Sequence, residues 1–418
     1  MTNPIPASSG RLFQRDFTIM VIGQIMSLFG NAALRFALSM SVLDATGSAA
    51  VFASILAVSM IPTVLLSPFG GILADRVSKR NIMIGLDFFT SASIFAFTLV
   101  FHQTASITSI AVIMILLSVI QSFYQPSVQS SIPSLVDGEH LMAANGIVVQ
   151  VNALSMLLGP VLGGLLFGFF GIYPILFASG FCFFCSAVME CFLHIPFEKK
   201  EGNDSLFHII KSDFSEALHF LLHEQRSVLY MLVLIAGINL FMSSMIMVGM
   251  PYIIKIHLGL SSQLYGLAEG ALGLGSILGG ILSGLAAGKM KFKKSYLLLF
   301  GTAIAVFPMA LAAVTKKAPL ASYFLIMFSV LVIMCFATLF SVFAQTLMQR
   351  LTPGHLLGKV AAVVTVICTC AYPVGQAMYG VLFDRAGGNA FLVVFISGII
   401  SICIALLSKR AVGAVPEV

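Results

Sequence analysis

Residues 49–80 read AAVFASILAVSMIPTVLLSPFGGILADRVSKR, a long uncharged run followed by a short charged segment. Its first part, residues 49–73, carries no charge and is long enough as a helix to cross the roughly 30 Å of hydrocarbon in a bilayer. The apolar run then ends in one acid and three bases. Basic residues gather on the cytoplasmic side of membrane helices. The stretch therefore predicts a membrane-spanning helix that ends at the inner surface.

Similar uncharged runs recur on both sides of this stretch, along a chain of 418 residues that is 59% hydrophobic and only 9% charged. In lipid, only helices and closed barrels satisfy all of their backbone hydrogen bonds. The runs are continuously apolar rather than alternating, which favours helices. We therefore expect an all-α membrane protein with twelve transmembrane helices. They are predicted at residues 17–41, 49–73, 81–101, 107–125, 142–168, 172–195, 228–254, 263–287, 295–314, 319–345, 357–382 and 389–408.

The distribution of Lys and Arg indicates how these helices are oriented. With the N-terminus inside, seventeen of the 22 basic residues fall in cytoplasmic segments: Arg11, Arg15, Arg76, Lys79, Arg80, Lys199, Lys200, Lys211, Arg226, Lys289, Lys291, Lys293, Lys294, Arg350, Lys359, Lys409 and Arg410. The outer loops hold Lys255, Lys316, Lys317 and Arg385. This bias predicts a multi-pass protein of the bacterial inner membrane with both termini in the cytoplasm. The net charge of +6 follows from this topology, and no nucleic-acid partner is expected.

Two parts of the chain repeat at one offset of 216 positions. Residues 135–141 (LVDGEHL) correspond to residues 351–357 (LTPGHLL). Three further matches join Gly164, Phe167 and Gly171 to Gly380, Phe383 and Gly387. The repeat predicts two pseudo-symmetric six-helix bundles, residues 1–195 and 228–418, with the substrate site at their interface.

The two predicted bundles are joined by a cytoplasmic linker, residues 196–227. Apolar residues recur in it at helical spacing: Leu206, Ile210, Phe214, Ala217 and Leu221. This spacing predicts an amphipathic helix on the inner membrane surface. Its expected role is that of a tether between the halves.

The most specific motif follows the second span and has the form G-x-x-x-D-R-x-x-K-R, made by Gly71, Asp75, Arg76, Lys79 and Arg80. An acid at this place is suited to face the N-terminus of another helix, where the helix dipole is positive. The spacing resembles the signature of the major facilitator superfamily, although Ser78 stands where that signature usually has Gly. The resemblance implies an inner gate in which Asp75 contacts the start of the eleventh span, near Gly358 and Lys359.

A second motif lies in the fifth span and consists of Gly159, Pro160, Gly163 and Gly164. Glycines allow helices to approach closely, and a proline can kink the helix. The run resembles the G-P-x-x-G-G motif of exporters that exchange substrate for protons, and this resemblance implies export. Tight packing alone is the alternative interpretation.

Residues 20–165 resemble the macrolide-efflux and enterobactin-exporter branch of the superfamily, notably at 23–30 and 125–126. The likeness continues more weakly along nearly the whole chain. Lysophospholipid transporters share much of the pattern, so the branch leaves the substrate open. Many proton-driven exporters have an Arg in the fourth span, whereas residues 107–125 hold no charge here. A proton relay in this chain cannot use that Arg.

Four charged residues fall within the expected spans, namely Arg35, Asp87, Glu190 and Glu269. A charge at the bilayer centre costs about 2.5–3.5 kcal/mol on insertion scales, so each of them needs a structural reason. We expect Asp87 and Glu190 to reach the inner surface or to pair with the bases at 76–80. Arg35 and Glu269 lie in the outer halves of their spans and are the candidates for proton coupling, because a carboxyl group in an apolar cavity can carry a proton. A static charge pair is the alternative.

Seven polar side chains are candidates for the wall of a substrate cavity: Gln24, Asn31, Gln121, Asn145, Asn152, Asn239 and Gln345. The chain also has 36 Phe and 21 Met residues, some of which could form an adaptable wall for bulky amphiphiles. Most of these apolar side chains must face lipid or other helices, so composition alone does not indicate a broad specificity.

The sequence contains no grouping of Ser, His or paired acids that is typical of an intramembrane enzyme, and no G-x-x-x-x-G-K-[ST] loop for ATP. We expect no enzyme activity, no cofactor and no metal. The predicted function is export of a hydrophobic or amphiphilic, macrolide-like molecule in exchange for protons, by a monomer in the lipid bilayer. The alternatives are a siderophore exporter, a lysophospholipid transporter and, from a different class, a receptor with the same fold.

Overall fold

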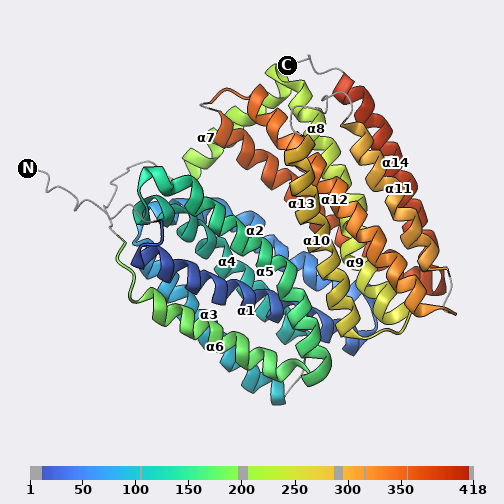
Figure 1. The fold of residues 1–418 in the computed structure, drawn as a ribbon, viewed down its shortest axis with the longest axis horizontal. Coiled ribbons are helices and arrows are strands. Elements are labelled where there is room, and N and C mark those ends of the chain that lie inside the picture. Colours follow the sequence, from blue (N-terminus) through green and yellow to red (C-terminus); the bar gives the residue numbers. More distant parts are fainter. Residues whose placement is uncertain are drawn as a thin grey trace, which may run out of the picture. The chain divides into compact units, whose positions relative to one another are not determined.

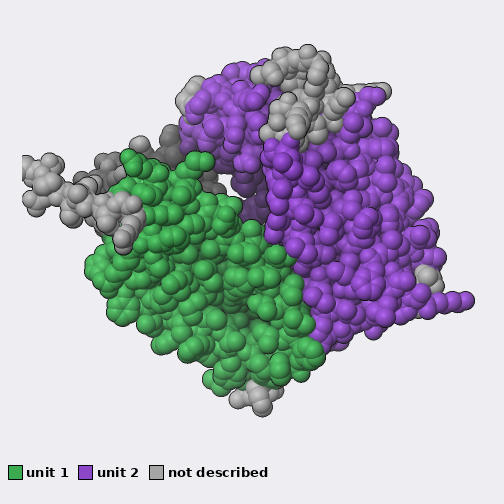
Figure 2. All heavy atoms as spheres, in the orientation of Figure 1, with its two compact units in different colours: residues 1–38, 65–203 green, residues 39–64, 204–418 purple. Residues whose placement is uncertain are grey.

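The computed structural model describes residues 12–103, 106–195, 206–286, 295–314, 317–354 and 356–413. Within these ranges the chain forms helices and short turns and contains no strand. It divides into two compact units, drawn in different colours in Figure 2. Unit 1 comprises residues 1–38 and 65–203, and unit 2 comprises residues 39–64 and 204–418.

Six long helices make up the first part of the chain, which Figure 1 draws from blue to green. They are α1 (Arg15–Thr46), α2 (Ala49–Arg76), α3 (Lys79–Gln103), α4 (Ile107–Leu135), α5 (Leu141–Phe170) and α6 (Ile172–Glu190). A short 3-10 turn, Gly138–His140, precedes α5. The core of unit 1 joins α1, α3, α4 and α5 through buried residues such as Phe17, Met83 and Val148.

The second part begins with the linker helix α7 (Leu206–His219) and a π-helical turn, Phe220–Glu224. One continuous helical segment follows, made of α8 (Arg226–Ile238), η3 (Asn239–Ser243), α9 (Ser244–Pro251) and η4 (Tyr252–His257), where η3 and η4 are π-helical. The remaining helices are α10 (Ser262–Ala286), α11 (Tyr296–Ala312), α12 (Pro319–Leu351), α13 (Leu357–Ala386) and α14 (Ala390–Gly413). Figure 1 shows α11 and α14 side by side, and they pack against each other.

Helix length and composition agree with a twelve-span protein. Ten described segments are long and apolar enough to cross a membrane, and the last of them, Leu357–Lys409, runs through both α13 and α14. The helix α11, of 17 residues, is a shorter apolar helix. With α11 included and α13 and α14 taken separately, each of the twelve expected spans corresponds to a helical segment in the described part of the chain.

Glycines set the distance between packed helices in unit 2. A Cβ atom at Gly275 of α10 would lie 2.3 Å from the carbonyl oxygen of Leu331, and one at Gly279 would lie 2.4 Å from that of Cys335. Both carbonyls belong to α12, so any larger residue would push α10 and α12 apart. This contact explains the G-x-x-x-G spacing in an otherwise apolar helix.

The repeat predicted from the sequence is present in the helix boundaries. The helix α5 covers Leu141–Phe170 and α13 covers Leu357–Ala386, so each has 30 residues and the two begin and end 216 positions apart. Each ends at a glycine with positive φ, 75° at Gly171 and 53° at Gly387. A left-handed residue just past the last turn is a common way to stop a helix, and glycine adopts it without strain.

The compact units divide the chain differently from the two halves expected from the sequence. Residues 39–64 group with unit 2, and so does the linker helix α7. The linker helix was expected to lie on the membrane surface. Two of its predicted apolar residues, Ala217 and Leu221, are buried against Val228 of α8 and Val360 of α13, and its position at the membrane surface stays a prediction.

Candidate functional site

The inner-gate motif lies where α2 ends and α3 begins. Lys79 Nζ donates to the carbonyl oxygen of Ser130 at 2.6 Å, and Arg80 Nη2 donates to that of Cys191 at 2.5 Å. These carbonyls belong to the C-terminal turns of α4 and α6, where a positive charge interacts favourably with the helix dipole. The two bases therefore tie three helices of unit 1 together at this end.

Asp75, the acid of the inner-gate motif, has no described side-chain contact. Gly71, Asp75 and Arg76 lie on the last turns of α2, but the side chain of Asp75 is outside the described part of the structure. The expected contact of Asp75 near Gly358 and Lys359 therefore stays a prediction. Lys359 itself is bound by two acids of the linker helix, Asp213 at 2.7 Å and Glu216 at 2.6 Å.

The glycines of the second motif seat α5 on α1. A Cβ atom at Gly159 would lie 2.3 Å from the Cβ of Ala32, and one at Gly163 would lie 3.1 Å from the Cα of Ala33. Small residues on both helices therefore allow a close backbone contact. Pro160 and Gly164 lie within the same stretch of α5, and Gly164 is buried. The contact accounts for the packing role of the motif and lies less than one helical turn from Arg35.

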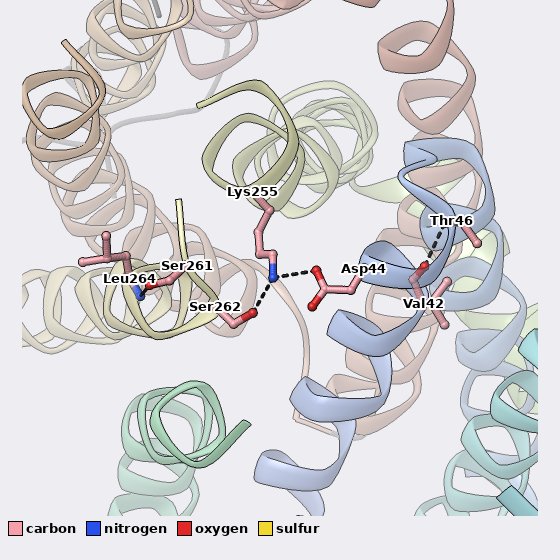
Figure 3. A network of polar contacts seen from close by, with 7 residues as sticks. All are labelled: Val42, Asp44, Thr46, Lys255, Ser261, Ser262 and Leu264. Atoms are coloured by element: carbon pink, nitrogen blue, oxygen red, sulfur yellow. Dashed lines mark hydrogen bonds and ion pairs between the residues drawn. The ribbon is translucent and has the colours of Figure 1, made fainter. Parts of the chain in front are cut away.

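The C-terminal ends of α1 and α13 meet other parts of unit 2 through polar contacts. Lys255 Nζ of η4 lies 2.5 Å from Asp44 Oδ1 of α1 and donates to Ser262 Oγ at 2.5 Å (Figure 3). The Lys255 side chain is only 11% exposed, whereas that of Asp44 is 40% exposed. Lys255 thus bridges the end of α1 and the start of α10.

A second acid caps the beginning of α2. Asp384 Oδ1 accepts the backbone N–H of Ala49 at 2.7 Å, and its Oδ2 accepts that of Ala50 at 3.1 Å and the hydroxyl of Ser48 at 2.5 Å. The first N–H groups of a helix have no partner within the helix, and the dipole there is positive. A carboxylate at this position satisfies both requirements.

Close packing accompanies this cap. A Cβ atom at Gly380, one turn before Asp384, would lie 2.7 Å from the Cβ of Ala53 on α2. Gly380, Asp384 and Arg385 have the G-x-x-x-D-R spacing of Gly71, Asp75 and Arg76. This second copy is not among the motifs predicted above, although its spacing is visible in the sequence.

The two residues expected to couple protons are each bound within their own unit. Arg35 of α1 donates from Nε to Asn31 Oδ1 at 3.2 Å and from Nη2 to Ser118 Oγ at 2.9 Å. Glu269 of α10 accepts a hydrogen bond from the hydroxyl of Tyr265, one turn earlier. Both charged side chains are half-buried. Their roles in proton coupling remain a proposal.

Asp87 and Glu190 differ from the expectation that they reach the surface or pair with the nearby bases. Asp87 is 1% exposed and accepts a hydrogen bond from Ser27 Oγ at 2.6 Å. Glu190 is 0% exposed and accepts one from the hydroxyl of Tyr124 at 2.7 Å. Arg80, one of these bases, binds the carbonyl of Cys191 instead. The side chains point between the helices because hydroxyl donors on α1 and α4 are available there.

Six of the seven cavity candidates are at least partly exposed, and they differ in their partners. Gln24 differs from the others in that its side chain is fully buried and both of its amide atoms lack a hydrogen-bond partner. Asn145 and Asn152 bond to the carbonyls of Leu141 and Val148 in their own helix. Asn31 accepts a hydrogen bond from Arg35, and Asn239 donates to the carbonyl of Cys368. Gln121 is partly exposed, and Gln345 is exposed. Which of them line a substrate cavity stays a prediction.

The sequence is similar to known transporters along most of its length. It is 23% identical over 389 residues to macrolide efflux protein A of Streptococcus pyogenes, a match that covers 92% of this chain and 93% of that protein. A shorter match, 26% identical over 165 residues, covers 39% of this chain and 39% of the lysophospholipid transporter LplT of Serratia proteamaculans.

Solved structures share the fold. A bacterial homologue of the iron transporter ferroportin, in an inward-facing state, has a TM-score of 0.73 at 18% identity, over 94% of this chain and 98% of that one. The nucleoside transporter NupG has a TM-score of 0.76 at 13% identity, over 96% of this chain and 100% of its own. Residues 20–375 match the family described as the Major Facilitator Superfamily. The chain is thus a membrane transporter that belongs to the Major Facilitator Superfamily.

Proposed function

We propose that this transporter exports a hydrophobic or amphiphilic small molecule in exchange for protons, by alternating access. The likeness to macrolide efflux protein A over 92% of the chain is the observation that carries the choice of export and of substrate class. The packing of Gly159 and Gly163 on α1 is consistent with the exporter-like motif that these residues form. In this proposal the protein works as a monomer in the bacterial inner membrane with both termini in the cytoplasm.

The outer polar network supports a cycle in which the outer side opens and closes. Asp384 and Lys255 hold residues 44–50, which join α1 to α2, against helices of the second half of the chain. An outward opening in alternating access requires these contacts to break. The groups that form them are partly exposed, so they can bind water when they separate. In this proposal Asp384 acts at the outer side as Asp75 is predicted to act at the inner side, each acid facing the start of another helix.

Glu269 is the proposed proton carrier of the second half of the chain. It is half-buried in an apolar helix, and the Tyr265 hydroxyl is the donor that binds its carboxyl group. A proton carrier must be reachable by water in one state and shielded in another. Arg35 is proposed as the fixed positive charge of the first half, held by Asn31 and Ser118.

The proposed function is tested by accumulation of labelled compounds in efflux-deficient bacteria that express the protein. A macrolide, a siderophore and a lysophospholipid are compared, with and without a protonophore. Lower accumulation of the macrolide that is lost with the protonophore supports the proposal. Lower accumulation of the lysophospholipid alone favours the second candidate, which the partial likeness to LplT supports. No change for any compound contradicts export and favours a receptor role.

A further inference from the structure

Two acids lie inside unit 1, away from the residues that the proposed function uses. Asp87 is on α3 and Glu190 ends α6, and at 1% and 0% exposure neither is in contact with solvent. Each accepts one hydrogen bond from a hydroxyl group, Asp87 from Ser27 of α1 and Glu190 from Tyr124 of α4. Four helices therefore meet at this pair.

The two acids belong to one cluster. Ser27, which binds Asp87, lies one turn after Gly23, and the Cβ position of Gly23 is 3.8 Å from Glu190 Cγ. Ser186, one turn before Glu190 on α6, lies beside Asp87 and donates to the carbonyl of Gly23 at 3.0 Å. A change of charge on one acid is therefore felt by the other.

No cation balances the pair in the part of the chain that the structure describes. None of the ion pairs found there includes Asp87 or Glu190. The groups that contact the two acids are neutral on α1 (Ser27), on α4 (Tyr124) and on α6 (Ser186), and Arg80 of α3 binds the carbonyl of Cys191. Two buried carboxylates that share a site without a cation cannot both be ionised at low cost, so such a pair holds a proton.

Unpartnered polar atoms mark the same place. Gln24 is 0% exposed, and its Oε1 and Nε2 have no hydrogen-bond partner, nor does Glu190 Oε2. Gln24 directly follows Gly23, whose Cβ position lies 3.2 Å from Ser186 Oγ. Buried polar groups without partners are rare in folded proteins, and each needs an explanation. A proton, delivered by water, is the ligand that fits two carboxyl groups surrounded by hydroxyl groups.

We propose that Asp87 and Glu190 form a proton-binding site within unit 1 that takes up one proton and releases it during the transport cycle. The inference rests on the proposed proton exchange. The proton passes from water to one carboxylate, giving the neutral acid, and returns to water when the site opens. The site also has a short path to the inner-gate motif, since Arg80 binds the carbonyl of Cys191, the residue that follows Glu190.

The first test observes the proton itself and needs no transport. Infrared difference spectra of the purified protein in lipid nanodiscs, recorded over a pH titration, report the C=O stretch of protonated carboxyl groups. A titrating band is expected in the parent protein and should be lost in Asp87→Asn and in Glu190→Gln. The control Glu139→Gln changes an exposed acid on the turn before α5 and should keep the band. Retention of the full band in both single variants would overturn the proposal.

Tyr124→Phe provides a milder variant in case the acid substitutions prevent folding. It removes the one hydroxyl that binds Glu190 and leaves both acids in place. The pH at which the band titrates should shift in this variant. An unchanged titration in Tyr124→Phe, like a full band in the acid variants, contradicts the assignment.

The second test separates the site from the proposed function. In proteoliposomes, counterflow of labelled substrate needs no gradient, whereas net uptake against a concentration difference needs a pH gradient. Asp87→Asn and Glu190→Gln should keep counterflow and lose the response to the pH gradient. If these variants respond to the gradient as the parent does, the site is wrong and the proposed function stands. If the parent lacks the response but keeps the titrating band, the proposed proton exchange and the role of the site in the transport cycle are both wrong, and only proton binding by Asp87 and Glu190 stands. A response to a sodium gradient that these substitutions abolish would replace the proton with sodium.

Discussion

Asp384 Oδ1 accepts the backbone N–H of Ala49 at 2.7 Å, so that an acid in the last turns of α13 caps the first turn of α2. The same carboxylate also binds the hydroxyl of Ser48 and the N–H of Ala50. One side chain thus satisfies three donors at a helix start, and the arrangement depends on its being a carboxylate.

Asp384→Ala removes this cap and should favour opening of the outer side. Loss of a helix cap costs about 0.5–2 kcal/mol, which shifts a two-state equilibrium by roughly two- to thirtyfold. The measurement is the labelling rate of Ala53→Cys, a buried position of α2 beside Gly380, with a membrane-impermeant thiol reagent in a background without the seven native cysteines. Labelling should be faster in Asp384→Ala than in Asp384→Asn, which keeps one oxygen acceptor. Equal labelling rates in Asp384→Ala and the parent would show that the cap formed by Asp384 does not hold this side closed.

The ion pair between Lys255 and Asp44 should contribute less than the Asp384 cap, because Asp44 is 40% exposed. A double-mutant cycle with Lys255→Met and Asp44→Asn, read out by the same labelling rate, should give a coupling energy of about 0.5–1 kcal/mol. The coupling should fall at high salt, since solvent ions screen exposed charges. Additive effects of the two substitutions would show that the pair has no role in closing the outer side.

Gly159→Ala should destabilise unit 1 by about 1–3 kcal/mol, because its methyl group would overlap the Cβ of Ala32. Thermal unfolding in detergent, followed by size-exclusion chromatography, measures the loss. The matched variant is Ala32→Gly together with Gly159→Ala, which moves the methyl group from α1 to α5 and should recover most of the stability. If the double variant is as unstable as the single one, the close contact between α1 and α5 is not the cause.

Glu269→Gln should abolish transport driven by a pH gradient while leaving expression and counterflow intact, since glutamine keeps the shape of the side chain but cannot release a proton. Tyr265→Phe removes the hydroxyl that binds Glu269 and should change the pH dependence of transport without abolishing it. Normal gradient-driven efflux by Glu269→Gln would remove this residue from the proton path.

The spans of this protein could be predicted from the sequence because uncharged runs and helix-stopping glycines are local properties. The pair α5 and α13 illustrates this, with the offset of 216 positions visible in both the sequence and the helix ends. Span positions give the depth of a side chain in the membrane but not the direction in which it points. For this reason Asp87 and Glu190 were expected to reach the inner surface or to pair with the bases at 76–80, whereas both are buried among the helices of unit 1.

Partners that are far apart in the sequence were harder to predict. Two of the three donors that Asp384 binds are backbone N–H groups 334 and 335 positions away, and backbone groups carry no residue-specific signal. Only the spacing shared by residues 380–385 and 71–76 hints at the contact. The contact of Asp75 itself remains a prediction, because its side chain lies outside the described residues.

The central claim is that substrate leaves the cell in exchange for protons. Everted membrane vesicles from the expressing bacteria, energised by respiration, hold an acidic interior that a pH-sensitive dye reports. Addition of the transported compound should make the interior less acidic, and the effect should be absent in vesicles carrying Glu190→Gln or Glu269→Gln. Entry of the labelled compound into parent vesicles with no change in the interior pH would contradict proton exchange.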